Sequence, residues 1–214
     1  MSNWLDTIMM LVAVSNLVML GSSRLAVLIR MCALQGVLLG LLPLLTGSGE
    51  FVWHRVLIAV GTLGLKGIVF PLLLSRARER SDVRREIEPY VSYNLSLAGG
   101  MGALVFSLWL GARLPLPEHL GSSLLVPLAL FTFLVGLFLI TTRKKALTQV
   151  VGYLAMENGV YAFGVAMALE TPLIVELGVL LDVFVAVFLM GIVIFQISRE
   201  FEHIDTDRLS SLKG

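Results

Sequence analysis

The sequence predicts an all-α fold, a polytopic membrane helix bundle with about seven transmembrane helices. Three observations support this prediction. Hydrophobic residues make up 57% of the 214 residues and charged residues 14%, whereas soluble domains average about 45–50% apolar and about 25% charged. The mean hydropathy is +0.90. The apolar residues are also gathered in runs of roughly 18–25 residues, the length that crosses about 30 Å of hydrocarbon.

The apolar runs follow one another with mostly short, polar connections. We expect helices over residues 4–20, 25–45, 51–74, 95–114, 124–141, 146–169 and 172–197. The last has a local start signal, because Thr171 can cap a helix and Pro172 at the first helical position loses no N–H that the helix needs. Pro43 and Pro71 lie near the ends of the second and third runs, where either can kink its helix.

The distribution of basic residues predicts the orientation. With seven spans, one side of the membrane receives only Arg55 and Arg113. The other side receives Arg24, Arg76, Arg78, Arg80, Arg84, Arg85, Arg143, Lys144, Lys145, Arg199, Arg208 and Lys213. Because basic loops stay in the cytoplasm, this asymmetry predicts an N-terminus outside and a cytoplasmic C-terminus. The long connection over residues 75–94 is expected to be a solvated loop or interfacial helix, or else a surface for a partner or anionic lipid.

Composition also limits the partners and cofactors. The net charge of +1 gives no reason to expect nucleic acid. The single cysteine, Cys32, lies in an apolar run and excludes an intrachain disulfide or a cysteine-rich metal site. The chain has no P-loop, no H-E-x-x-H and no G-x-G-x-x-G in a strand–helix setting. We therefore expect no cofactor and no metal bound by this chain alone, and contact with the lipid bilayer.

Two carboxylates lie near the middle of adjacent predicted spans. Glu157 is about 16 Å into the sixth run and Asp182 about 15 Å into the seventh, at 1.5 Å per residue. An ionisable group at this depth costs a few kcal/mol and usually has a function. Burial disfavours the charged form of an acid, so such groups can exchange protons near neutral pH. We predict that both are proton-relay acids; the alternative is a static interhelical bond that only holds the bundle.

A polar stripe accompanies the first of these acids. Gln149, Tyr153, Glu157 and Tyr161 recur every four residues and therefore share one slowly drifting face of a helix. The stripe could lead from the cytoplasmic end to the midplane. Gln149, Tyr153 and Tyr161 are therefore candidate path residues.

Three further charged residues could join the path. Lys66 lies about 22 Å along the third run, among glycines in GTLGLKGIVFP. It is expected either to pair with an acid, as a third relay residue, or to extend to the interface. Arg30, nearer the cytoplasmic end, is more typical of a side chain that reaches the interface. Glu176, close to the outer surface, is either a proton exit group or an interfacial residue.

Glycine spacing adds one packing expectation. Gly36 and Gly40 are four residues apart in the second run and permit close approach of another helix, although glycine is also common in membrane helices.

The C-terminal part carries a family pattern. The basic turn 143–145 leads into a helix in which Gly152, Met156 and Asn158 fall in the order G-x-x-x-M-x-N, and the chain ends with Ile204-Asp205 and Leu212-Lys213-Gly214. In these features residues 124–214 resemble the small three-helix K subunit of bacterial respiratory complex I. The resemblance implies that Glu157, about one turn beyond the K subunit's first glutamate, and Asp182, in the region of its second, serve a proton path.

The whole chain is longer than that subunit. With GYLAMENGVYAFG in the C-terminal part and LKGIVFP in the N-terminal part, it resembles the HyfE-like family, membrane component E of hydrogenase-4-type nickel–iron hydrogenase and formate hydrogenlyase complexes. The expected organisation is a four-helix N-terminal part over residues 1–122 and a three-helix K-like part with a short cytoplasmic tail over 123–214.

This resemblance implies a function and a set of partners. The chain would be a non-catalytic, multi-pass subunit in the bacterial inner membrane that contributes to a proton or ion path coupled to redox chemistry in other subunits. Its partners would be antiporter-like and quinone-channel-like membrane subunits and the hydrogenase peripheral arm. Two alternatives stay open: a K-like subunit of a multisubunit cation/proton antiporter, and a purely structural membrane scaffold.

Overall fold

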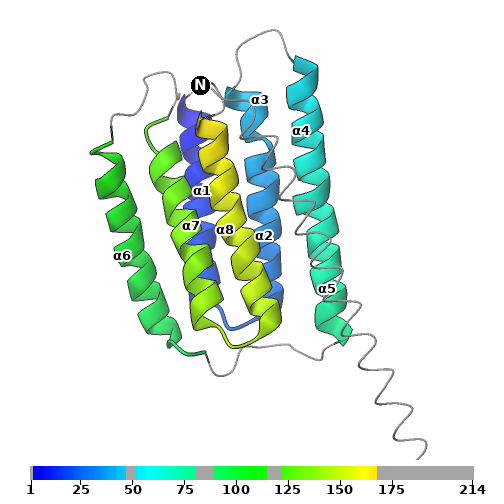
Figure 1. Ribbon diagram of the computed structural model, residues 1–214, viewed down its shortest axis with the longest axis vertical. Coiled ribbons are helices and arrows are strands. Elements are labelled where there is room, and N and C mark those ends of the chain that lie inside the picture. The colour runs from blue at the N-terminus through cyan, green and yellow to red at the C-terminus, as the bar shows by residue number, and fades with distance from the viewer. Residues whose placement is uncertain (1, 47–51, 81–88, 115–121, 168–214) are drawn as a thin grey trace, which may run out of the picture.

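The structure is a computed structural model that describes residues 2–46, 52–80, 89–114 and 122–167. These residues form helices joined by turns, without a strand, as the sequence predicts (Figure 1). In chain order the helices are α1 (Ser2–Gly21), α2 (Leu25–Gly40), α3 (Leu42–Thr46), α4 (Val52–Gly64), the π-helix η1 (Leu65–Val69), α5 (Phe70–Arg80), α6 (Tyr93–Gly111), α7 (Leu125–Thr142) and α8 (Ala146–Met167). The helix expected over 172–197, with Glu176 and Asp182, lies outside the described residues.

The bundle has the lengths and composition of a membrane protein. Within the described ranges, five stretches are long and apolar enough to cross a membrane: Trp4–Gly21, Leu25–Leu45, Ala59–Glu79, Tyr93–Gly111 and Leu125–Thr142. Side chains that face outward on α6, such as Leu95, Val105 and Trp109, are also apolar and more than half exposed. The prediction of a polytopic membrane helix bundle is confirmed, whereas seven spans and their orientation stay predictions.

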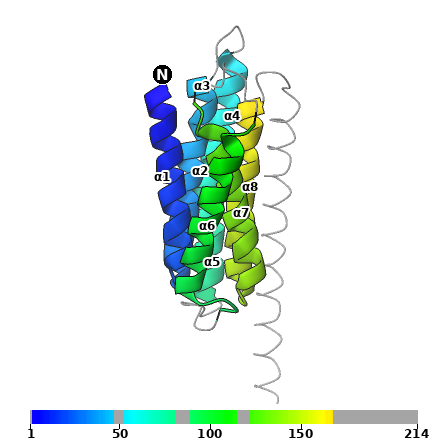
Figure 2. The same ribbon diagram turned by 90° about the vertical axis from the view of Figure 1, so that its left-hand side faces the viewer.

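The helices stand side by side around a central group of four. Helices α1, α2, α7 and α8 form this centre, with α6 on one flank against α1 and α7 (Figures 1 and 2). The column α4–η1–α5 lies on the other flank against α2. Buried apolar side chains from the four central helices, such as Met9, Leu28, Phe131 and Val151, form the core together with Phe70, Leu74 and Ala77 of α5.

Helices α7 and α8 pack most closely, and glycine makes this possible. A Cβ at Gly136 of α7 would collide with the backbone of Met156 on α8. A Cβ at Gly159 of α8 would lie 2.8 Å from the carbonyl oxygen of Ala129 on α7. Small residues at both positions therefore let the two backbones touch. This contact fixes the rotation of α8 and so the faces on which Glu157 and Asn158 lie.

Both prolines singled out in the sequence lie at breaks in regular α-helix. Helix α2 ends before Leu41, and Pro43 lies in the first turn of the short helix α3 that follows. In the column α4–η1–α5, the Phe70 N–H donates to the carbonyl oxygen of Leu65, five residues back. This hydrogen bond closes the wide turn of η1. Pro71 follows at once and has no N–H to donate, so regular α-helical bonding cannot continue through this point.

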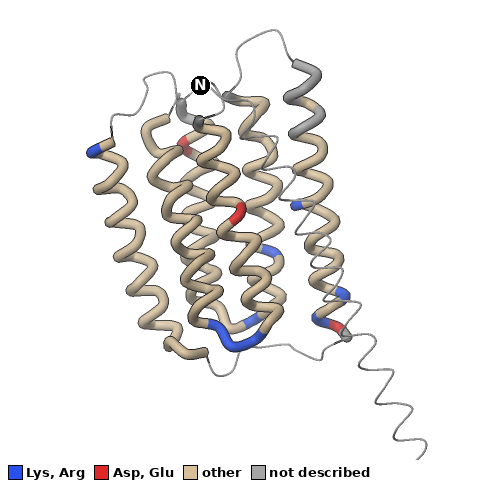
Figure 3. Tube along the Cα trace, viewed as in Figure 1, with Lys and Arg blue, Asp and Glu red and all other residues tan. Residues whose placement is uncertain are grey.

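One end of the bundle is basic. Figure 3 shows most of the described lysines and arginines near the end that holds the α1–α2 and α7–α8 connections, while Arg113 follows α6 at the opposite end. Arg143, one of the basic residues assigned to the cytoplasmic side, is 1% exposed. Its guanidinium lies over the ring of Tyr93 at 4.8 Å from the centroid, so this arginine belongs to the packing of the bundle.

Candidate functional site

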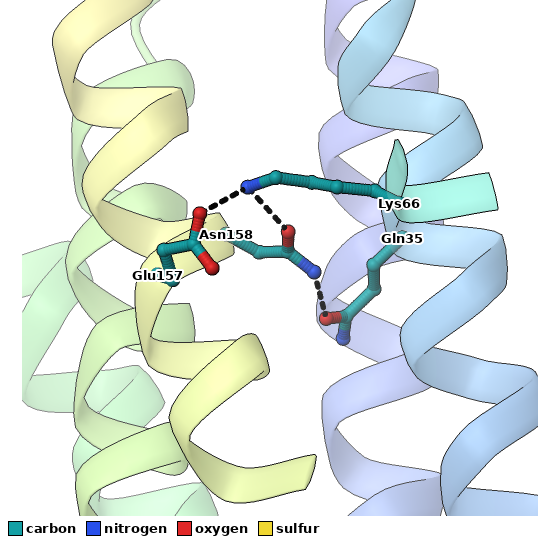
Figure 4. A network of polar contacts seen from close by, with 4 residues as sticks. All are labelled: Gln35, Lys66, Glu157 and Asn158. Atoms are coloured by element: carbon teal, nitrogen blue, oxygen red, sulfur yellow. Dashed lines mark hydrogen bonds and ion pairs between the residues drawn. The ribbon is translucent and has the colours of Figure 1, made fainter. Parts of the chain in front are cut away.

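A buried ion pair lies in the middle of the bundle. The Nζ of Lys66 lies 2.9 Å from Oε1 of Glu157, and both side chains are 3% exposed. The same ammonium donates a hydrogen bond to Oδ1 of Asn158 at 3.2 Å (Figure 4). Lys66 comes from η1 and the two acceptors from consecutive positions of α8. The structure thus brings together two of the three predicted relay residues and shows Lys66 paired with an acid.

An ion pair in this position is expensive to bury. Removing each charge from water costs several kcal/mol, and the pair recovers this only when other hydrogen bonds satisfy the remaining groups. Asn158 supplies one such bond to Lys66. Among the described residues, Oε2 of Glu157 is buried without a hydrogen-bond partner. Within the described residues the pair is therefore incompletely satisfied.

The approach of α2 to η1 positions Lys66. A Cβ at Gly36 would lie 2.5 Å from the Cβ of Lys66 and 3.1 Å from its carbonyl carbon and oxygen. A Cβ at Gly40 would lie 2.9 Å from Cγ of Leu63 on α4. Both glycines therefore lie at the close helix contact that their spacing permits. The wide turn of η1 also turns Lys66 inward, since residues in a π-helix face directions that a continuous α-helix would not give them.

Tyr161 closes one side of the ion pair. Its ring centroid lies 5.0 Å from the Nζ of Lys66, and the residue is buried. A desolvated cation over an aromatic face gains about 2 kcal/mol. The Thr62 side chain lies next to the Tyr161 phenol, but neither hydroxyl oxygen has a hydrogen-bond partner in the described part of the chain. Tyr161, predicted as a path residue, is thus part of the site.

A chain of uncharged polar side chains extends the site across the bundle. Asn158 Nδ2 donates to Gln35 Oε1 at 3.3 Å, and Gln35 Nε2 donates to Asn16 Oδ1 at 2.8 Å. Asn16 Nδ2 donates to Thr132 Oγ1 at 2.8 Å. Gln35 Nε2 also donates to Ser15 Oγ at 2.8 Å. These residues come from α8, α2, α1 and α7 and are at most 2% exposed.

Sequence reasoning missed Ser15, Asn16, Gln35 and Thr132 as site residues and treated Asn158 only as part of a motif. It searched the apolar runs for ionisable groups. Amides within predicted spans carry a similar signal, because they too require partners away from water. A search for Asn and Gln inside the runs would have found the three amides.

The other described path candidates, Gln149, Tyr153 and Arg30, are not joined to the site by side-chain hydrogen bonds. Gln149 Nε2 donates to the carbonyl oxygen of Arg143 at 2.8 Å, near the basic end. Tyr153 is half-buried against the core. In the described part of the chain no side-chain hydrogen bond links Tyr153 to Gln149 or to Glu157. Arg30 is exposed on α2. The residues of the stripe therefore share a face of α8, but the chain of side-chain hydrogen bonds that starts at Lys66 runs across the helices.

The same site lacks the donors of a metal centre. Within the described ranges, no group of three or more His, Cys, Asp or Glu residues is placed to hold a metal ion.

Comparison with known proteins matches the C-terminal part to a family. Residues 124–214 match the model of NADH-ubiquinone/plastoquinone oxidoreductase chain 4L. Over 189 residues the chain is 35% identical to protein Rv0085 of Mycobacterium tuberculosis, covering 87% of this chain and 85% of the relative. Over 151 residues it is 28% identical to hydrogenase-4 component E of Escherichia coli K12, covering 70% of this chain and 69% of the relative. The chain belongs to the HyfE-like family of complex-I-related membrane subunits. No solved structure matches it.

The boundary of the chain 4L match, at residue 124, runs through the site of this HyfE-like chain. Glu157, Asn158 and Thr132 lie within the chain 4L region, whereas Lys66 and Gln35 precede it. The helices before residue 124 therefore supply the counter-charge of Glu157 and the amide partner of Asn158 within a single polypeptide.

Proposed function

We propose that this chain is a membrane-arm subunit of a complex-I-related hydrogenase complex, in which Glu157 and Lys66 carry protons through the middle of the membrane. One observation carries the proposal: a lysine and a glutamate, each 3% exposed, are paired at 2.9 Å in the centre of an apolar helix bundle. Buried ion pairs are seldom worth their desolvation for stability alone. Ionisable groups at membrane depth usually mark ion or proton pathways.

The chemistry is a proton transfer between two atoms already in contact. The proton leaves Nζ of Lys66 and binds Oε1 of Glu157, so that ammonium and carboxylate become amine and carboxylic acid and no charge is created. Burial brings the free energies of the two states closer, because it penalises the charged pair. A further proton or charge arriving nearby can then shift the pair from one state to the other. Redox energy released in other subunits would supply that bias.

The remaining parts of the path belong to the same proposal. Asp182 would be the second relay acid, on the helix expected after α8, with Glu176 nearer the outer surface. The basic end of the bundle would face the cytoplasm of a bacterial cell, with the N-terminus outside. Antiporter-like and quinone-channel-like membrane subunits and the hydrogenase peripheral arm would be the partners.

The test is coupled proton transport by the intact complex in proteoliposomes. We expect Glu157→Gln and Lys66→Met to lower the number of protons moved per redox turnover at least tenfold, with the complex still assembled. Glu79→Gln, which neutralises an exposed glutamate on α5, is the matched control and should transport normally. Unchanged transport in both site variants would contradict the proposal. Loss of assembly without specific uncoupling would instead favour a scaffold.

A further inference from the structure

The three buried amides that continue from Lys66 are joined in one direction. Each accepts a hydrogen bond through its oxygen on the side toward Lys66 and donates through its nitrogen on the far side, in the order Asn158, Gln35, Asn16. The last donor reaches Thr132 Oγ1, whose hydroxyl donates to the carbonyl oxygen of Leu128 at 2.8 Å. Every contact therefore pairs one donor with one acceptor.

This direction cannot be changed at a single residue. Rotating the amide of Gln35 alone would set its oxygen against Asn16 Oδ1 and its nitrogen against Asn158 Nδ2, two mismatched contacts at once. The chain would have to reverse as a whole. A reversed chain would present the Asn158 NH2 group to the Lys66 ammonium, which has donors only. The ammonium form of Lys66 therefore determines the direction of all three amides, and the amides in turn stabilise the ammonium.

The amide chain has a different role from the ion pair. Side-chain amides are not among the groups that take up and release protons in general acid–base steps, so a proton does not travel from Lys66 toward Thr132 along them. We propose that Gln35 and Asn158 are positioning residues, which hold the Lys66 ammonium in place against Glu157 by presenting it with a fixed oxygen acceptor. The relevance of this positioning to proton movement rests on the proposed function. The positioning of the Lys66 ammonium does not.

Other groups also act on Lys66, and they face it from two helices. Among the described residues, Glu157 and Tyr161 approach from α8, and the Cys32 thiol on α2 is close enough to interact with its charge. None of these is changed by a substitution at Gln35. A change in Lys66 on removing the Gln35 amide would therefore report the amide chain and not the ion pair.

The test follows the charge of Lys66 directly. The full-length chain, labelled with 15N-lysine and placed in lipid bilayers, contains four lysines, Lys66, Lys144, Lys145 and Lys213. Nuclear magnetic resonance separates ammonium from amine nitrogen, and the signal missing in Lys66→Met identifies Lys66. The measurement needs no transport activity. A failure of the positioning proposal is therefore distinguishable from a failure of the proposed function.

We expect Gln35→Leu to free the Asn158 amide and to lower the pH at which Lys66 deprotonates by up to about one unit. The upper limit is the value of the whole Asn158 hydrogen bond to the ammonium, which this variant weakens and does not remove. Native Lys66 can stay an ammonium at every pH tested. In that case the expected result is that Lys66 of the Gln35→Leu variant deprotonates within the tested range. Thr132→Val, at the far end, should cause less than half the shift. Gln149→Leu, which removes a glutamine bonded only near the basic end, should cause none.

The Gln35→Asn variant keeps an amide at position 35, but its side chain is too short to reach Asn158. If Gln35→Leu does not fold, the titration of Lys66 in Gln35→Asn tests the proposal. The proposal is overturned if the folded Gln35 variants titrate as the native chain does. It is also overturned if Thr132→Val shifts Lys66 as far as they do, because the effect would then be general loosening of the bundle.

Discussion

The guanidinium of Arg143 donates a hydrogen bond to the carbonyl oxygen of Leu20, 3.0 Å away and 123 residues earlier in the chain. Leu20 is in the last turn of α1, where carbonyl groups have no partner within the helix. A cation at this end also interacts favourably with the helix dipole. The turn between α7 and α8 thus caps the helix that begins the chain.

We expect Arg143→Ala to lower the free energy of unfolding by about 1–3 kcal/mol, since it leaves a buried carbonyl without its donor. Thermal unfolding of the purified chain measures this loss. Arg76→Ala removes an exposed arginine on α5 and should change stability by less than about 0.5 kcal/mol. Equal effects of the two substitutions would mean that the Arg143–Leu20 bond contributes nothing.

A methyl group at position 36 should disturb the site without touching a polar atom. Gly36→Ala places its Cβ against Cβ and the carbonyl of Lys66, and we expect a loss of about 1–3 kcal/mol in unfolding free energy from overpacking. Gly61→Ala is the control, because nothing lies within 4 Å of its Cβ. Alanine should be tolerated there and can even stabilise the helix. A neutral Gly36→Ala would show that α2 and η1 can separate freely.

The α7–α8 contact should be equally sensitive. Gly136→Ala would drive a methyl group into the backbone of Met156, which cannot move aside as a side chain can. We expect a fall in thermal midpoint, whereas Gly102→Ala on α6, with open space around its Cβ, should unfold at the native temperature. An unchanged midpoint for Gly136→Ala would contradict the close packing of these two helices.

The energy of the ion pair can be measured with a double-mutant cycle. Lys66→Met or Glu157→Leu alone leaves an unpaired buried charge and should cost about 3–5 kcal/mol. The double variant should cost clearly less than the sum of the two, because both charges are gone and apolar side chains fill the space. Chemical unfolding of all four proteins gives the coupling energy. Strictly additive costs would mean that the two charges do not interact.

Much of the fold follows from hydropathy. The helices expected over 4–20 and 124–141 are found as Ser2–Gly21 and Leu125–Thr142, because a run of apolar residues bounded by polar turns has few other folds in a membrane. Hydropathy does not distinguish one helical hydrogen-bond pattern from another, however. The end of α2 before Leu41 and the π-helix at 65–69 were therefore indicated only by the nearby prolines.

The site could be predicted only in part. Lys66 and Glu157 could be singled out because a charge in an apolar run is conspicuous, but their pairing depends on which helices become neighbours, and a single sequence does not contain that information. Gln35 and Asn16 gave a weaker signal, because an uncharged amide is less costly at membrane depth. The roles of Asp182 and Glu176 stay predictions, outside the described residues.

The positive partner of Glu157 belongs to the same polypeptide. During biogenesis the acid therefore enters the lipid with its neutralising group already attached through the chain, and it does not have to wait for another gene product. A subunit built in this way can be inserted early and stored in the membrane, because the charge of Glu157 is already paired before the other components arrive.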